Sequence, residues 1–308
     1  MKPLAKYLAR RFAASILILL GVVTITFCLI FIFPADPAVQ IAGPHATPEV
    51  VASIRHQKHL DEPLYVQYAY YVGGLLRGDL GQSFKQRTQV AELVWSRLPA
   101  TLLLMLGAIF FELLIGIPLG ILAAARRGKI DRGIMIMAFA GVSAPQFVVG
   151  LILLYVFAYV FGWFPLSGYG GLSHLILPAL TLGIGGGGWY ARVLRSNLVE
   201  VMRQDYIRTA RAKGLSERKV VLIHALRNAI LPAVAMVGLD IGTFMGGAVV
   251  VETVYGWPGI GQLAWQAIQL VDTPIIMGVT LVAAVAIVIG NLLADLVTPL
   301  IDPRVRLR

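Results

Sequence analysis

Four acidic residues lie inside or directly beside long apolar stretches of the chain: Glu112, Asp240, Asp295 and Glu252. An ionisable side chain is costly in an apolar medium, so it usually faces a polar partner or a water-filled interior. Asp240 is the strongest candidate for lining a pore, because it lies mid-run between Gly238 and Gly242. Glu112 and Glu252 are further pore-lining candidates. A hydrogen-bonded structural role for Glu112 and an interface position for Asp295 are the alternatives.

A basic segment from Gln204 to Pro232 carries a second set of signals. Asp205 is placed to cap a first short helix, and Gly214 supplies the left-handed position that ends it. Ser216 then caps a second helix, in which Val220, Ile223 and Arg227 recur at the spacing of one face. We expect a rigid helix-turn-helix that docks on another protein, through a small surface at Thr209 and Ala210. An ordinary basic loop is the alternative.

The residues that we expect to carry this docking share the segment with those helix signals. They are Asp205, Arg208, Thr209, Ala210, Arg211, Lys213, Gly214, Leu215 and Arg227.

Metal, phosphate and catalytic chemistry find little support in the sequence. The histidines His45, His56 and His59 have no defined ligand geometry, and Cys28 is the single cysteine. The glycine run from Gly183 to Gly188 is not followed by the Lys-Ser or Lys-Thr of a phosphate-binding loop. No nucleophile with a neighbouring base can be assembled. We therefore expect a chain that is not an enzyme and holds no metal or cofactor of its own.

The elements that must position these residues are membrane-spanning helices. Hydrophobic residues make up 58% of the 308 residues and charged residues only 14%, which a soluble domain could not bury in one core. A span needs about 20 apolar residues. Six runs qualify, at Phe12 to Phe33, Pro99 to Ala125, Gly133 to Phe161, Leu175 to Val199, Asn228 to Val251, and Pro274 to Leu300.

The distribution of charge predicts the orientation of these spans. Twenty of the 26 Lys and Arg residues fall before the first run, between the second and third, around and after the end of the fourth, or at the C-terminus. The segments Gly162 to His174 and Glu252 to Thr273 contain none. The positive-inside rule therefore predicts that both termini are cytoplasmic. Because the charges alternate with the crossings, a nucleic-acid surface is a poor explanation of the net charge of +10.

We accordingly expect an all-α membrane protein with six transmembrane helices. Residues 1–33 form the cytoplasmic N-terminus and first span, and residues 34–98 form a small extracytoplasmic cap with its own turns. Residues 99–308 form a core of five spans that contains the docking segment at 203–227. The first run is too long for a signal peptide and is expected to be retained.

Several motifs, taken in order along the chain, resemble those of one family. They are Phe33 to Ala38 (FPADPA), Leu60 to Tyr68, Gly73 to Phe84, Arg97 to Leu104, Ser143 to Pro145, Asp205 to Val220, Val249 to Gly261 and Ile301 to Arg306. The chain is similar to the permease subunits of binding-protein-dependent ABC importers, in the dipeptide, oligopeptide and nickel branch. Arg208 replaces the acidic residue of the broad family pattern at the docking segment, while Gly214 matches it.

This resemblance implies a subunit of the bacterial cytoplasmic membrane that imports dipeptides or short oligopeptides. The subunit would form half of a pore with a second, homologous permease subunit. Two cytosolic ATPases, separate or fused, would bind ATP and Mg²⁺. They would drive alternating access through the docking segment at 203–227, which we call the coupling segment. An extracytoplasmic solute-binding protein would deliver the solute.

Two other functions stay open on the sequence. A nickel or other small-solute importer of the same branch would share the scaffold. An ion-coupled carrier would need coupling-ion groups at the membrane midplane and usually shows inverted repeats, which we do not find.

Overall fold

The computed structural model describes residues 2–31, 37–43, 46–57, 59–126, 128–246 and 248–301. In this part of the chain it is almost wholly helical, and its β pairing is limited to one antiparallel bridge between Gln82 and Gln89. The all-α expectation is confirmed for the described residues.

The first half of the chain contains one long N-terminal helix, three short helices and then the longest helix, followed by a bent pair. These are α1 (Lys2–Phe31), α2 (Pro37–Ala42), α3 (Pro48–Gln57), α4 (Leu64–Leu76), α5 (Val90–Ala125), α6 (Lys129–Ser143), α7 (Gln146–Leu153) and a π-helical turn η1 (Leu154–Val160).

The second half alternates long helices with short ones. These are α8 (Leu172–Val201), α9 (Asp205–Ala212), α10 (Glu217–Lys219), a π-helical turn η2 (Val220–Ala225), α11 (Leu226–Ala229), α12 (Leu231–Met245), α13 (Val249–Val254), α14 (Ile260–Leu270) and α15 (Thr273–Ile301).

Three helical stretches of the described chain are long and apolar enough to cross a membrane: Arg10–Cys28, Val90–Ala125 and Thr273–Leu293. Two bent pairs also qualify if each is counted as one span. They are Lys129–Ser143 with Gln146–Val160, and Glu217–Ala229 with Leu231–Met245. The structure thus offers three to five candidate spans where the sequence predicted six.

The fourth predicted span, Leu175 to Val199, is helical but does not pass as a span by composition. It lies within α8, a helix of 30 residues or about 45 Å. The glycine run and the arginines near its end lower the mean hydropathy of this helix. Because α8 packs between α5 and α6 and buries much of its surface, it does not need a lipid-facing composition all round.

Two predicted spans are not single straight helices. Between α6 and α7 the chain turns by 102° at Ala144 and Pro145, where proline lacks the N–H that a continuous helix requires. The run from Asn228 to Val251 is divided among α11, α12 and α13, with Pro232 in the first turn of α12. The sequence reading overlooked both breaks because apolar composition alone does not report them.

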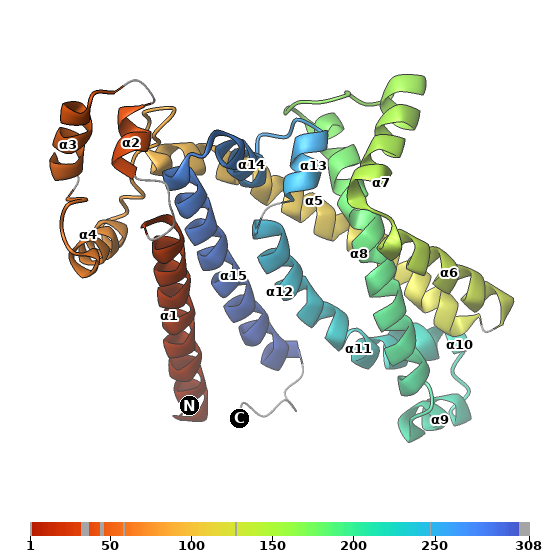
Figure 1. Cartoon of the computed structure of the whole chain (residues 1–308). Helices are drawn as coiled ribbons and strands as arrows, with labels where there is room; N and C mark the ends of the chain where they lie inside the picture. Colours follow the sequence, from red (N-terminus) through yellow and green to blue (C-terminus); the bar gives the residue numbers. More distant parts are fainter. Residues whose placement is uncertain are drawn as a thin grey trace.

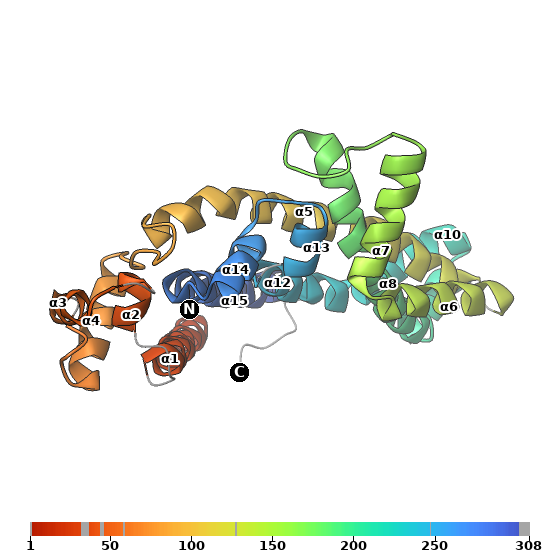
Figure 2. The same cartoon turned by 45° about the horizontal axis from the view of Figure 1, so that its top comes forward.

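The helices are spread along one direction rather than closed into a ring. α2, α3 and α4 lie at one end of this arrangement and α6 at the other (Figure 2). The start of α1 and α9 both lie at the lower side of Figure 1, and α2, α3, α13 and α14 lie towards its upper side. The coupling segment therefore lies on the opposite side of the described chain from the short helices that follow α1 and α12.

Candidate functional site

The coupling segment folds as a compact unit of short helices, α9 to α11, that packs on its own small apolar core. We call this unit the elbow. Ile207 of α9 is fully buried and packs with Val220, Leu194 and Leu198. Gly214 adopts φ of 74°, the left-handed conformation that the sequence predicted for the end of the first helix. The turn therefore joins α9 to α10 and η2 over buried apolar side chains.

Two polar contacts between separate helices hold the elbow together. Arg211 of α9 forms an ion pair with Glu217 of α10, with 2.7 Å between the closest N and O atoms. The amide nitrogen of Asn228 in α11 donates to the hydroxyl oxygen of Tyr206 in α9 at 2.8 Å. These side chains tie the segment directly to the helix that leads into α12.

Several details of the predicted segment differ from the structure. Asp205 does not cap α9, because Gln204 occupies that position and the Asp205 carboxylate instead pairs with Arg208 at 3.2 Å. Ser216 holds the N-cap position of α10 without a side-chain hydrogen bond. Ala210 is buried and not part of a surface with Thr209.

The predicted face of Val220, Ile223 and Arg227 is also wrong. Val220 is buried, whereas Ile223 is 59% exposed and Arg227 is exposed. The reason is the π-helical turn η2, whose wider hydrogen-bonded ring shifts the residues that follow out of α-helical phase.

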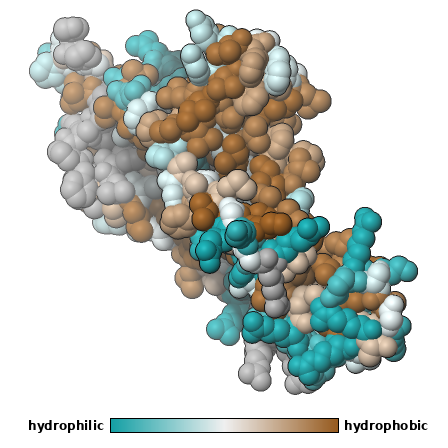
Figure 3. Space-filling view, turned by 90° about the vertical axis from the view of Figure 1, so that its right-hand side faces the viewer, coloured by the Kyte–Doolittle hydropathy of each residue, from teal (hydrophilic) through white to brown (hydrophobic). Residues whose placement is uncertain are grey.

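The exposed surface of the elbow mixes basic and apolar side chains. Arg208, Thr209, Lys213 and Arg227 are exposed, and Leu215 is half-buried. Figure 3 shows apolar side chains over the upper part of this face of the molecule and hydrophilic ones gathered at its lower end, the end at which Figure 1 places α9. Tyr206, Leu222 and Ile223 add exposed apolar area. Such a mixed surface is suited to docking on a protein partner.

A buried polar cluster joins three helices in the interior. Glu112 of α5 is 2% exposed, and its carboxyl group interacts with that of Asp240 in α12. The hydroxyl of Tyr190 in α8, also buried, donates to Oδ2 of Asp240. Glu112 and Asp240, both singled out from the sequence, are thus brought together. The side chain of Asp295 lies outside the described residues.

Close packing of α5 on α8 forms the wall of this cluster. A Cβ atom at Gly186 would collide with the carboxyl group of Glu112, and one at Gly116 would collide with Tyr190. Gly188 lies equally close to the backbone carbonyl of Ala138 in α6. The glycine run is therefore a packing surface, as the structural reading of the sequence expected, because small residues allow helix backbones to approach closely.

Glu252 anchors the segment that follows α12. It is fully buried in α13, where Thr101 donates to Oε1 at 2.9 Å and the backbone N–H of Gln262 donates to Oε2 at 2.8 Å. Gly259 lies directly against its carboxyl group. These contacts favour a positioning role for Glu252 over direct contact with a solute in a pore.

Trp257 shares this buried environment. It is fully enclosed, and its indole N–H donates to the carbonyl of Ala100, so it joins α5 to the segment after α13.

Asp272 is a functional candidate that the sequence reading missed. It is buried just before α15 and accepts from Ser83 Oγ at 2.5 Å and from the backbone N–H groups of Phe84 and Lys85 at 3.2 Å. These bonds fasten the loop before α5 to the start of the last helix. An aspartate followed by Thr273 and Pro274 is typical of an ordinary helix start. This local pattern does not predict the contact with the distant Ser83.

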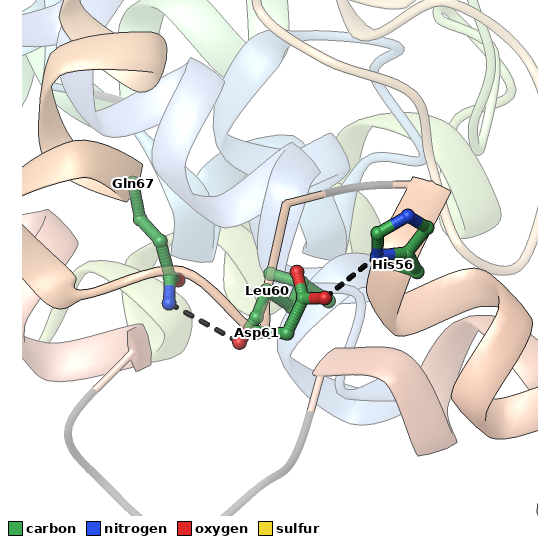
Figure 4. Close-up of polar contacts among 4 residues, drawn as sticks. All are labelled: His56, Leu60, Asp61 and Gln67. Atoms are coloured by element: carbon green, nitrogen blue, oxygen red, sulfur yellow. Dashed lines mark hydrogen bonds and ion pairs between the residues drawn. The ribbon is translucent and has the colours of Figure 1, made fainter.

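The described histidines His56 and His59 make other contacts than those of a metal site. His56 Nδ1 lies 2.8 Å from Asp61 Oδ2, and Gln67 donates to the carbonyl of Leu60 beside them (Figure 4). The hydrogen bond to Asp61 raises the pKa of His56. His59 stacks on Tyr70 with 4.6 Å between ring centroids. His45 lies outside the described residues, and no metal-binding group of three ligands occurs within them.

A family described as "Binding-protein-dependent transport system inner membrane component" matches residues 116–307, and the N-terminal domain of such membrane components matches residues 4–105. The chain belongs to this family. It is a multi-pass membrane protein of a transport system, and its family is one of transport permeases rather than catalytic enzymes.

Full-length relatives of this permease support the assignment. The chain is 41% identical over 314 residues to the oligopeptide transport system permease protein AppB of Bacillus subtilis, covering 98% of this chain and 99% of that protein. It is 40% identical over 301 residues to the glutathione transport system permease protein GsiC of Salmonella typhimurium, covering 97% and 98% of the two chains. GsiC of Escherichia coli K12 is 39% identical.

The fold of the permease also matches a solved transporter. An inward-facing form of the MetNI methionine ABC transporter superposes with a TM-score of 0.58 and 21% identity, covering 68% of this chain and 96% of that one. At this identity the likeness concerns the fold alone. It places the helices of this chain in the architecture of an ABC transporter permease.

Proposed function

We propose that this permease forms half of the translocation pathway of an ATP-driven importer for short peptides. The elbow of α9 to α11 carries the proposal, because it is a rigid exposed unit that continues without a long linker into α12. A push on such a unit moves α12 directly. A second permease subunit, two cytosolic ATPases and an extracytoplasmic solute-binding protein complete the assembly.

The proposed topology has six spans, with α8 completing the set, and both termini on the cytoplasmic side. The coupling segment at 203–227 then faces the ATPases, with Arg208, Thr209 and Lys213 exposed for contact. The short helices α2 to α4 lie outside the membrane on the opposite side. The basic residues around α9 and their absence from Glu252 to Thr273 support this orientation.

ATP binding by the partner subunits supplies the movement. When the ATPases close, the docked elbow shifts and α12 changes its packing against α5 and α8, which opens the pathway to alternate sides. Asp240 is only half-buried and borders the exposed Leu239 and Thr243 of α12, so it is the acidic residue best placed to meet a solute.

The solute is proposed to be a peptide because the relatives that match almost the whole chain are named for oligopeptide and glutathione transport. Nickel import gains no support from the described histidines, since His56 pairs with Asp61 and His59 stacks on Tyr70.

Reconstitution tests the proposal. The permease would be purified with its partner subunits, placed in proteoliposomes with its solute-binding protein, and supplied with radiolabelled dipeptide, pentapeptide, glutathione or nickel. We expect uptake of at least one peptide that requires ATP. Uptake that continues without nucleotide, or uptake of nickel alone, would contradict the proposal.

A further inference from the structure

The carboxyl group of Glu112 is incompletely satisfied. Its Oε2 atom is buried and has no hydrogen-bond partner among the described residues. Buried polar atoms are rarely left in this state, so an orphan oxygen calls for an explanation such as an unseen ion. Because Glu112 is 2% exposed within this single chain, a partner subunit cannot reach it, and the missing partner must be small.

No ion pair within the described residues neutralises the cluster. Neither Glu112 nor Asp240 forms an ion pair with a described basic side chain. Gly186 of α8 lies against the Glu112 carboxyl, and Tyr190, one turn further along α8, donates to the Asp240 carboxyl. Two carboxyl groups that neighbour each other inside an apolar bundle cannot both stay charged without a compensating cation.

The packing limits what that cation can be. Gly186 lies so close to the Glu112 carboxyl that not even a methyl group fits between them. On the other side, Asp240 of α12 is half-buried, so its side chain is not fully enclosed. The site is therefore enclosed at Glu112 and accessible at Asp240.

We propose that Glu112 and Asp240 form a binding site for one small cation, and that in this tightly packed arrangement the cation is a proton shared between the two carboxyl groups. The proton completes the contact of α12 with α5 and α8. Its loss leaves two adjacent negative charges that repel each other and separate these helices. The consequence for transport rests on the proposed function, because α12 is the helix that the coupling elbow would move.

Thermal unfolding of the assembled importer in lipid nanodiscs tests the site without requiring transport. The midpoint temperature Tm would be measured between pH 6 and pH 9 in N-methylglucamine buffer, for the wild type, Glu112→Gln and Asp240→Asn. The proton is bound in the folded state, so its stabilisation is present at low pH and is lost as pH rises. We expect the wild-type Tm to fall as pH rises over part of this range, and each variant to flatten the profile.

Glu92→Gln is the matched control, because Glu92 is an exposed acid of the same helix α5. It should keep the wild-type profile. If Na⁺ or K⁺ at fixed pH raises the wild-type Tm and not that of Glu112→Gln, the occupant is an alkali ion and the assignment of a shared proton is wrong. If Glu112→Gln and Asp240→Asn retain the full dependence on both pH and alkali ions, or the wild type has neither dependence, the site does not exist. If the wild-type importer gives these Tm results but takes up no peptide, only the proposed function is contradicted.

Discussion

Single glycines decide how closely the helices of this permease approach. Gly188 lies against the carbonyl of Ala138 on α6, whereas Gly185, three residues earlier in the same run, has its nearest atom 3.8 Å from where a Cβ would be. Neighbouring residues of one type therefore carry different structural demands. The sequence shows a run of glycines, and only the contacts separate those that are required from those that are not.

Gly188→Ala should destabilise the protein, because the added methyl group collides with backbone that cannot rotate away. Overpacking of this kind costs about 1–3 kcal/mol. Gly185→Ala is the control: it meets only ordinary contact and should be neutral or stabilise the helix by about 0.5–1 kcal/mol. Denaturation of the two purified variants measures the difference. Equal stability would show that α6 and α8 are not packed as described.

Among the elements, the elbow illustrates how short helices become a rigid unit. α9 has only eight residues and would not be stable alone. Burial of Ile207, the Arg211–Glu217 ion pair and the Tyr206–Asn228 hydrogen bond give it a fixed place on η2 and α11. The exposed ion pair contributes little free energy by itself. The fixed angle between the helices depends mainly on the buried core and on the turn at Gly214.

Replacing Gly214 with valine should uncouple ATP hydrolysis from uptake. A β-branched residue at φ of 74° is strained by about 1–3 kcal/mol, although the position has open space for a side chain. Gly133→Val is the control, since Gly133 also has open space but an ordinary φ. Uptake per ATP hydrolysed would be measured in proteoliposomes. A Gly214→Val importer with wild-type uptake and substrate-stimulated ATPase activity would remove the turn from the coupling mechanism.

At the scale of the whole molecule, buried carboxylates fasten segments that are distant in sequence. Asp272 holds the loop around Ser83, and Glu252 joins α13 to Thr101 of α5 and the start of α14. Both anchors lie on the opposite side of the described chain from the elbow, as the positions of α13, α14 and α9 show (Figure 1). The chain thus has two differently built ends, which the proposed topology assigns to opposite sides of the membrane.

Cysteine labelling in intact cells tests that topology. Cys28 would first be replaced by alanine, leaving no other cysteine, and Gln86→Cys or Arg218→Cys would be added singly at exposed positions. A membrane-impermeant maleimide should label the Gln86→Cys protein from outside. The Arg218→Cys protein should react only after the membrane is permeabilised. The reverse pattern would invert the proposed orientation.

Local chemistry predicted the parts of the candidate site that depend on neighbouring residues. Gly214 adopts the left-handed turn that its position between two basic helices indicated. The phase of the second helix was not predictable in this way, because the π-helical turn η2 depends on packing against α9 and α11. The capping role of Asp205 failed for a similar reason, since its carboxylate instead contacts Arg208.

The sequence alone determined that this chain is helical and lipid-embedded, because apolar run length and backbone hydrogen-bonding demand leave few other structures. Only the tertiary structure decided that Glu112 lies beside Asp240, which is 128 positions away in the chain. The same is true of the hydrogen bond between Asp272 and Ser83. Periodicity and caps act over a few residues, whereas these contacts depend on how whole helices pack. Their partners are therefore not encoded in any local pattern, although the residues that make them are.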